Sequence, residues 1–182
     1  MIRRDGLYRR LRERSGAGGG ALYVFVVGLA AMSVSGLLAF LLGQPLIFPS
    51  LGPTVYLFFE SPMSEAASPR NTILGHFIGV CVGLAMLWVF GLMGEPSVAQ
   101  AGASLAYAAA GTLSVAVTGA LQLLTRIWHA PAGATTLIVS LGVLGTVREA
   151  LVLAAGIVIL TATGWIINHL AGIPVPVWAT RQ

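Results

Sequence analysis

A short run of histidine, proline, glycine and threonine lies between two long apolar stretches in the second half of the chain. It reads RIWHAPAGATT. Its His129 donates one hydrogen bond when neutral and, when protonated, adds a charge and a route for proton coupling. Pro131 and Gly133 disfavour a continuous helix, and the hydroxyls of Thr135 and Thr136 are hydrogen-bond donors. These residue types suit the binding of a small anion.

An upstream stretch, residues 47–54, repeats the pattern more weakly and reads IFPSLGPT. In lipid, backbone that leaves a helix is tolerated only where protein or a water-filled cavity covers it. A pair of interrupted segments, one in each half of a chain, is typical of a transport site. Each break predicts a short helix that begins near mid-membrane, around Gly52 and Gly133.

The start of such a helix favours an anion. Its first backbone N–H groups lack partners and carry a partial positive charge, so two helix starts that face one cavity form an anion site without a buried cation. Ser50 is expected to cap its helix and to offer a hydroxyl. The residues predicted to contact the anion are Ser50, Gly52, Pro53, Thr54, His129, Pro131, Gly133, Ala134, Thr135 and Thr136.

These residues also have purely structural interpretations. Pro and Gly can merely kink a membrane helix, and Thr can bond the carbonyl one turn back. A histidine inside a membrane segment is a functional candidate by default. We interpret His129 in this way, and for His76 we leave the two interpretations open. Arg70 is expected to snorkel to the interface, with Asn71 in a contact at the helix start. His76, Arg70 and Asn71 are candidates for a supporting or proton-handling role.

The composition predicts an integral membrane protein. Of the 182 residues 57% are hydrophobic and 9% charged, with a mean hydropathy of +0.88, whereas soluble domains carry about 25% charged residues. The net charge of +4 comes from residues 1–20, where six Arg face Asp5 and Glu13. This basic flank indicates a cytoplasmic N-terminus in a bacterial inner membrane and favours lipid over nucleic acid as partner. The single Cys81 rules out an intrachain disulfide, and no metal site is expected.

The predicted fold is all-α, with four full transmembrane helices and two broken half-helix segments. A basic arm with a Gly-rich joint (1–20) precedes a single transmembrane domain (21–173) and a tail (174–182). The uninterrupted apolar segments, each long enough to cross about 30 Å of hydrocarbon, are residues 21–43, 72–94, 98–124 and 150–171. The broken segments cover residues 44–59 and 126–145. Gly75, Gly79 and Gly83 recur every four residues and predict a close helix contact.

The two halves of the domain, residues 21–94 and 98–171, can be aligned with each other. Residues 50–54 match residues 131–135, 81 positions later. If the broken segments re-enter, each half has two spans and the halves are parallel. If they cross, each half has three spans of opposite orientation, and Arg70 and Arg126 join the N-terminus inside, with Arg148 the exception. An extended stretch at about 3.3 Å per residue followed by a short helix is long enough to cross. We therefore predict a 3+3 inverted repeat.

The string His129–Thr135, with SPRN at residues 68–71 and Gly75–His76 upstream, resembles the HPP family. The family consists of small integral membrane proteins named for a His-Pro-Pro motif, and the likeness covers roughly residues 45–150. Ala130 stands where the family has its first proline. Members are described as four-span proteins, and some plant and cyanobacterial members are implicated in nitrite transport. The resemblance implies transport of nitrite or a similar small anion.

Two other classes of function remain open. A haem-binding or redox membrane protein would use His76, His129 or His169 as ligands, although no cofactor is expected. A non-transporting partner subunit would use the small-residue helix faces. An enzyme is not expected, because the only aspartate is Asp5 and no activated serine is evident. Because so short a chain has few residues with which to enclose a pathway, we expect a homo-oligomer.

Overall fold

The computed structural model describes residues 6–176, and over this range the chain is helical, without strands. The four long apolar helices are α1 (Leu7–Leu42), α3 (Pro69–Val89), α5 (Leu105–Thr125) and α7 (Val147–Leu170). The short elements are α2 (Leu51–Glu60), the 3-10 turn η1 (Glu65–Ala67), α4 (Val98–Ala101) and α6 (Ala132–Ser140). The prediction of an all-α membrane protein with four full spans is confirmed.

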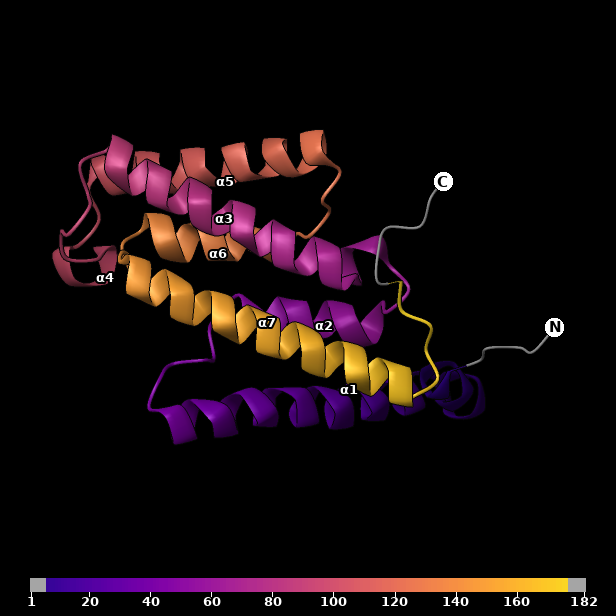
Figure 1. Ribbon diagram of the computed structural model, residues 1–182. Helices are drawn as coiled ribbons and strands as arrows, with labels where there is room; N and C mark the ends of the chain where they lie inside the picture. The colour runs from indigo at the N-terminus through magenta and orange to yellow at the C-terminus, as the bar shows by residue number, and fades with distance from the viewer. Residues whose placement is uncertain (1–5, 177–182) are drawn as a thin grey trace.

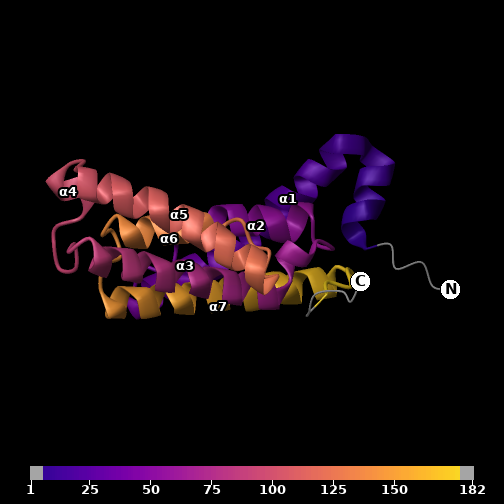
Figure 2. The ribbon, with the colours of Figure 1, turned by 90° about the horizontal axis from the view of Figure 1, so that it is seen from above.

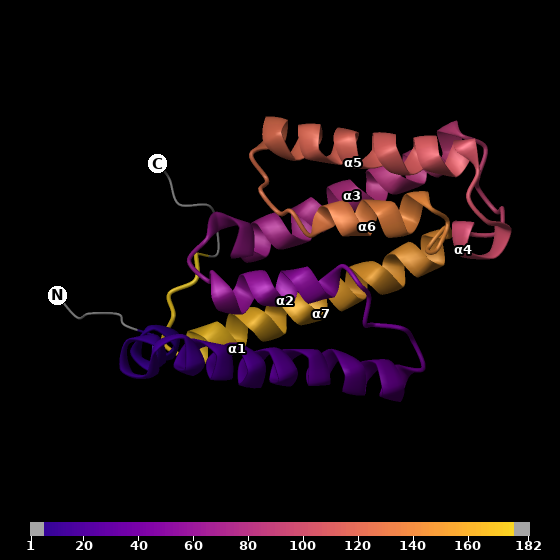
Figure 3. The same cartoon turned by 180° about the vertical axis from the view of Figure 1, so that it is seen from behind.

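Both predicted breaks are present, because the chain is non-helical over residues 44–50 and 127–131. Each break is followed by a short helix, α2 in the first half and α6 in the second. Figures 1 and 3 show that both short helices begin near the middle of the bundle and run toward opposite ends. The two breaks therefore carry the chain through the bundle between the ends of the long helices.

The third long segment is shorter than its predicted 98–124. Residues 98–101 form the separate helix α4, which begins with a capping box between Ser97 and Gln100. Gly102 ends it with φ +83°, a conformation that favours glycine. Ser104 then caps α5, because its hydroxyl accepts a hydrogen bond from Tyr107 N–H at 3.3 Å.

The first helix contains the arm and the joint as well as the first span. Only Ser15 and Gly16 leave helical φ/ψ, and residues 17–20 already belong to the helix that continues into the span. The part before the kink folds back, and the rings of Tyr8 and Tyr23 lie 5.3 Å apart. Figure 2 shows this indigo segment standing off one end of the bundle. Leu7 N–H donates to Ala171 O at 2.9 Å, which ties it to the end of α7.

The helices form two packed groups, and each group contains one long helix from the other half of the sequence. The short helix α2 packs between α1 and α7, while α6 packs between α3 and α5, and α3 contacts α7 to join the two groups. In sequence α3 belongs to the first half, yet it packs on the short helix of the second. In the same way α7 packs on the short helix of the first half.

Three glycines of α3 form its contact with α6, as their spacing predicts. A Cβ on Gly75 would lie 2.7 Å from His129 Cβ, and one on Gly79 would lie 2.7 Å from Ala132 O. A Cβ on Gly83 would lie 2.6 Å from Val139 Cβ. Because real Cβ atoms do not approach so closely, the glycines permit the short distance between α3 and α6.

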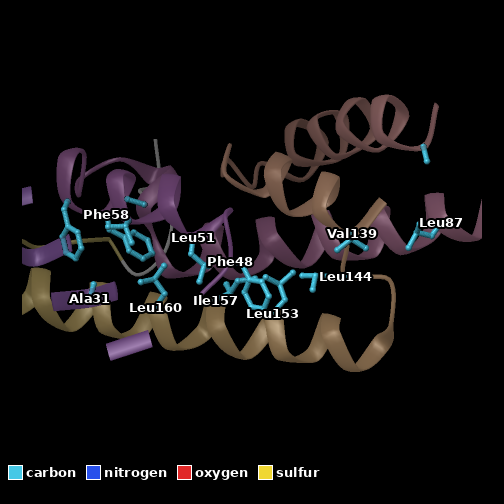
Figure 4. Packing of buried hydrophobic residues seen from close by; sticks show 14 of the residues in the cluster. Ala31, Phe48, Leu51, Phe58, Leu87, Val139, Leu144, Leu153, Ile157 and Leu160 are labelled. Atoms are coloured by element: carbon cyan, nitrogen blue, oxygen red, sulfur yellow. The ribbon is translucent and has the colours of Figure 1, made fainter. Parts of the chain in front are cut away.

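The apolar core runs through both groups of helices, and its larger part lies among α1, α2 and α7. Figure 4 shows Phe48, from the first break, beside Leu153 and Ile157 of α7, and all three side chains are buried. The outward faces are also apolar: Phe25 of α1 and Leu124 of α5 are 66% and 78% exposed. A continuous apolar exterior of this kind is suited to lipid.

Candidate functional site

Two buried histidines meet where the second break passes α3. His76 lies one-third of the way along α3, and His129 lies in the non-helical stretch before α6. Their rings are in edge contact with centroids 4.7 Å apart, and the two Nε2 atoms are 3.1 Å apart. The exposed fractions are 0% and 1%, so the pair is closed off from solvent.

The first turns of both short helices contact this pair. Thr135 Oγ1 of α6 lies 2.7 Å from His76 Nδ1. Thr54 Oγ1 of α2 lies 3.1 Å from His76 Nε2 and 3.3 Å from His129 Nε2. Thr54 and Thr135 are the residues that the internal alignment matches. The polar side chains of both breaks therefore converge on one histidine of α3.

The partners determine which nitrogen of each ring carries the proton. His129 Nδ1 lies 2.8 Å from Ala66 O, and a carbonyl only accepts, so Nδ1 is the protonated nitrogen of His129. In the neutral ring Nε2 is then an acceptor, and His76 Nε2–H donates to it. His76 Nδ1 accepts from the hydroxyl of Thr135. The result is a directional chain of hydrogen bonds from Thr135 through both rings to Ala66 O.

The side chain of Gln122 in α5 holds the backbone of His129 in place. Gln122 Nε2 donates to His129 O at 3.1 Å, and His129 N–H donates to Gln122 Oε1 at 3.2 Å. Gly75 leaves room for both residues, because a Cβ there would lie 2.7 Å from His129 Cβ and 3.5 Å from Gln122 Nε2. Gln122, Thr72 and Ala66 were not among the predicted site residues, although Thr72 Oγ1 lies 3.5 Å from His129 Nδ1. For Gln122 a signal existed, since it is the only amide side chain in α5.

The starts of the two short helices differ in their free N–H groups. At α2, Leu51 N–H donates to Phe48 O at 2.9 Å, while the N–H of Gly52 has no acceptor among the described residues. At α6 the first amides are all bonded to the preceding turn, for example Gly133 N–H to Ala130 O at 2.9 Å. The sequence predicts free N–H groups at both starts, but the tight turn before α6 occupies those of that helix.

The other predicted residues divide into buried and outer groups. Ser50, Asn71 and Thr136 are fully buried, and within the described structure Ser50 Oγ, Asn71 Nδ2 and Thr136 Oγ1 have no hydrogen-bond partner. Buried polar atoms of this kind are rare. Asn71 Oδ1 accepts from Arg70 Nη1 at 3.0 Å, which confirms the predicted contact at the start of α3.

The outer group does not join the histidines. Gly52, Gly133 and Ala134 are half-buried, Pro53 is exposed, and a Cβ added to either glycine would meet nothing within 4 Å. Pro131 is buried at the turn before α6. These residues shape the breaks, whereas the side-chain cluster itself consists of Thr54, Thr72, His76, His129 and Thr135.

The remaining histidine is not part of the pair. His169, in the last turn of α7, stacks on Trp165 with the rings 5.4 Å apart. A haem iron would need to lie between two ring nitrogens, but the Nε2 atoms of His76 and His129 point at each other. Among the described residues, no group of three or more His, Cys, Asp or Glu side chains gathers as a metal site.

Four apolar spans, two interrupted segments and a buried polar cluster between them define a multi-pass helical membrane protein. The family model described as "HPP, transmembrane region" matches residues 15–176. The chain therefore belongs to the HPP transmembrane family, as its motifs indicate. Comparison with the curated proteins and with the solved structures found no match.

Proposed function

We propose that the chain is a transporter for a small monovalent anion, and that the anion binds where the first turns of α2 and α6 approach the His76–His129 pair. The observation that carries this proposal is the convergence of Thr54 and Thr135 on the two ring nitrogens of His76. Two half-helices that start at one point in mid-membrane direct the positive ends of their dipoles toward it.

Unpaired polar atoms in the segments that form the pair and the helix starts add to this support. Ser50 immediately precedes α2, Thr136 follows Thr135 in α6, and Asn71 lies five residues before His76 in α3; Ser50 Oγ, Thr136 Oγ1 and Asn71 Nδ2 are all unpaired among the described residues. Together with the N–H of Gly52 they are donors without acceptors. A small anion is an acceptor only, so it would satisfy donors that the protein leaves unpaired.

The topology proposed for this transporter is a 3+3 inverted repeat in which both breaks cross the membrane. The opposite directions of α2 and α6 support it (Figure 3). Arg70 Nη1 lies 3.4 Å from Arg126 O. Arg70 is in the first turn of α3 and Arg126 ends α5, and Figure 1 shows both of these helix ends at the end of the bundle where the arm of α1 lies. Because basic residues accumulate on the inner side, this end is assigned to the cytoplasm of a bacterial inner membrane.

We assign the conformation to the occluded state of a carrier. Thr54, His76, His129 and Thr135 are at most 1% exposed, and they are bonded to one another. An open channel would leave such a site wet. A carrier instead closes around its site and exposes it to one side at a time.

The wide apolar exterior of α1 is assigned to a contact with a second copy of the chain.

Nitrite is the anion that the HPP resemblance implies. Flux of nitrite, nitrate, formate and chloride into liposomes that contain the purified protein alone tests the transport proposal. Uptake above that of empty liposomes is expected. Its absence for all four anions would instead favour a non-transporting partner subunit.

A matched pair of variants tests the site. In Thr54→Val/Thr135→Val the hydroxyls of Thr54 and Thr135 are lost with little change in volume. We expect at least tenfold slower uptake, since a hydrogen bond to a charged group contributes about 1.5–3 kcal/mol. Thr112→Val is the control, because Thr112 is exposed and its hydroxyl donates to Ala108 O. Equal uptake by both variants would show that the anion does not bind at this site.

A cysteine at position 70 tests the topology. In the inverted repeat it is modified by a membrane-impermeant thiol reagent only from the cytoplasmic side. The background is Cys81→Ser, which removes the native cysteine. Labelling from the periplasmic side would contradict the crossing of the first break.

A further inference from the structure

We propose that the His76–His129 pair is a proton-binding site and that one proton accompanies each anion. This inference rests on the proposed function and adds the coupling ion to it. The ring nitrogens contact only hydroxyls, one backbone carbonyl and each other. Because one Nε2 donates and the other accepts, the pair is complete when both rings are neutral.

The pair can accept one proton without losing a partner. The arriving proton is taken up by His76 Nδ1 on the side of Thr135, and the Nε2 proton of His76 moves along the existing 3.1 Å hydrogen bond to His129 Nε2. His129 then donates from both nitrogens, and His76 Nδ1–H donates to Thr135 Oγ1. The Thr135 hydroxyl turns to another acceptor, since a hydroxyl both donates and accepts. A second proton would place two N–H groups face to face, so the capacity of the pair is one.

The charged pair lacks a counter-charge in its immediate surroundings. Helix α6 contains no ionisable residue, and the acidic, arginine and histidine side chains of the other elements around the pair lie toward helix ends: Glu60 of α2, Glu65 of η1, Arg70 of α3, Arg126 after α5, and Arg148, Glu149 and His169 of α7. The other titratable side chains of these helices, Tyr56, Cys81 and Tyr107, carry no charge while they are protonated. None of them is a hydrogen-bond partner of either ring among the described residues. An unpaired buried charge is costly.

An anion at the starts of α2 and α6 would supply that counter-charge. The anion gains a positive neighbour and the protonated pair gains a negative one, so each raises the affinity for the other by the same factor. The loaded site is neutral overall, and crossing the membrane in this form moves no net charge. The pair therefore makes transport an electroneutral symport of one proton and one anion.

Proteoliposomes that contain the full chain and an internal pH dye test the inference with nitrate, whose acid does not cross lipid in a neutral form. We expect an inward nitrate gradient to acidify the lumen by one proton per nitrate, at a rate that a potassium–valinomycin potential does not change. Nitrate entry that follows the potential and leaves the lumen pH constant would overturn the proton inference and leave anion transport standing. No entry of nitrate, nitrite, formate or chloride would overturn both.

Two variants and a control locate the proton on the pair. His129→Asn keeps an N–H that can donate to Ala66 O but has no atom at Nε2, and His76→Gln keeps a donor but has no second ring nitrogen. For both we expect the rate of nitrate-driven acidification to fall at least tenfold, whether or not nitrate still enters. His169→Gln, the control, should keep the ratio of one. A ratio of one in either pair variant, in protein that elutes as a single species in detergent, would overturn the assignment.

Discussion

Both breaks are followed by a short helix, but Phe48, buried in the first break, is apolar, whereas His129, buried at the matching position of the second break, is polar. In the second break the ring of His129 contacts His76 of α3, and the Cβ atom of His129 packs close to the neighbouring Gly75. The positions 81 residues away are Phe48, Ile157 and Gly156; there the phenyl ring lies beside the isoleucine in the apolar core (Figure 4). Both arrangements let the chain leave the helix under cover of a long helix. The histidine pair is therefore not needed to form a break, which supports the chemical role proposed for it.

Replacing the polar interior by its apolar counterpart should have the largest effect. The double variant His76→Ile/His129→Phe copies the residues of the first break, and we expect anion uptake to be lost. Each single variant leaves the other ring without its partner, at a cost of about 1–3 kcal/mol. The double variant should be destabilised by less than the sum of the singles, with a coupling of about 0.5–3 kcal/mol.

Thermal unfolding in detergent, read beside the flux assay, checks this cycle. Additive losses in stability would mean that the two rings do not interact, and undiminished uptake by the double variant would mean that the difference between the two breaks has no function.

Substitutions of the glycines that face the two breaks, Gly75 and Gly156, should have smaller effects on stability and uptake than the double histidine variant. An added Cβ would lie 2.7 Å from His129 Cβ at Gly75 but 3.0 Å from Leu46 O at Gly156. We expect Gly75→Ala to cost about 1–3 kcal/mol by overpacking and to slow uptake by displacing His129. Gly156→Ala should cost less and leave the pair in place.

Gly133→Ala serves as the control for this comparison, because the space around Gly133 is open and alanine favours the helix. A stability near or above that of the unsubstituted chain is expected in thermal unfolding. If Gly75→Ala were as benign as Gly133→Ala, the close contact of α3 with the second break would be refuted.

The smallest effect is expected at Ala130, where the family motif has proline. Ala130 is exposed, and its N–H has no acceptor in the described part of the chain. Ala130→Pro therefore removes no hydrogen bond, and a change in stability within about 1 kcal/mol is expected. Uptake and thermal unfolding should both stay near the values of the unsubstituted chain, and a loss of either would show that the N–H of Ala130 has a role.

Much of the architecture could be predicted from the sequence. The spans follow from long apolar runs, the breaks from Pro49, Pro53 and Pro131, and the glycine seam from its spacing of four. The start of α5 could not be placed in this way, because Gly102 and Ser104 interrupt a segment that composition alone reads as one span.

The site was predictable only in part. Thr54, His129 and Thr135 were predicted as neighbours of an anion, but His76 was left open, because its pairing with a residue 53 positions away depends on how α3 packs on α6. The support from Gln122 and Ala66 depends on the same packing. The first N–H groups of α6 are bonded to the carbonyls of the preceding turn, at His129, Ala130 and Pro131. No pattern of residue types in the sequence predicts these hydrogen bonds.

The proposed mechanism requires that the second break and α3 bring two neutral histidine rings into a direct Nε2–Nε2 hydrogen bond inside the membrane domain. Nitrogen-15 NMR of histidine-labelled His169→Gln protein in micelles measures this most directly. We expect His129 to be protonated at Nδ1, His76 to be protonated at Nε2, and the two Nε2 atoms to show a scalar coupling across the hydrogen bond. Two uncoupled rings that exchange freely between tautomers would contradict the proposed mechanism.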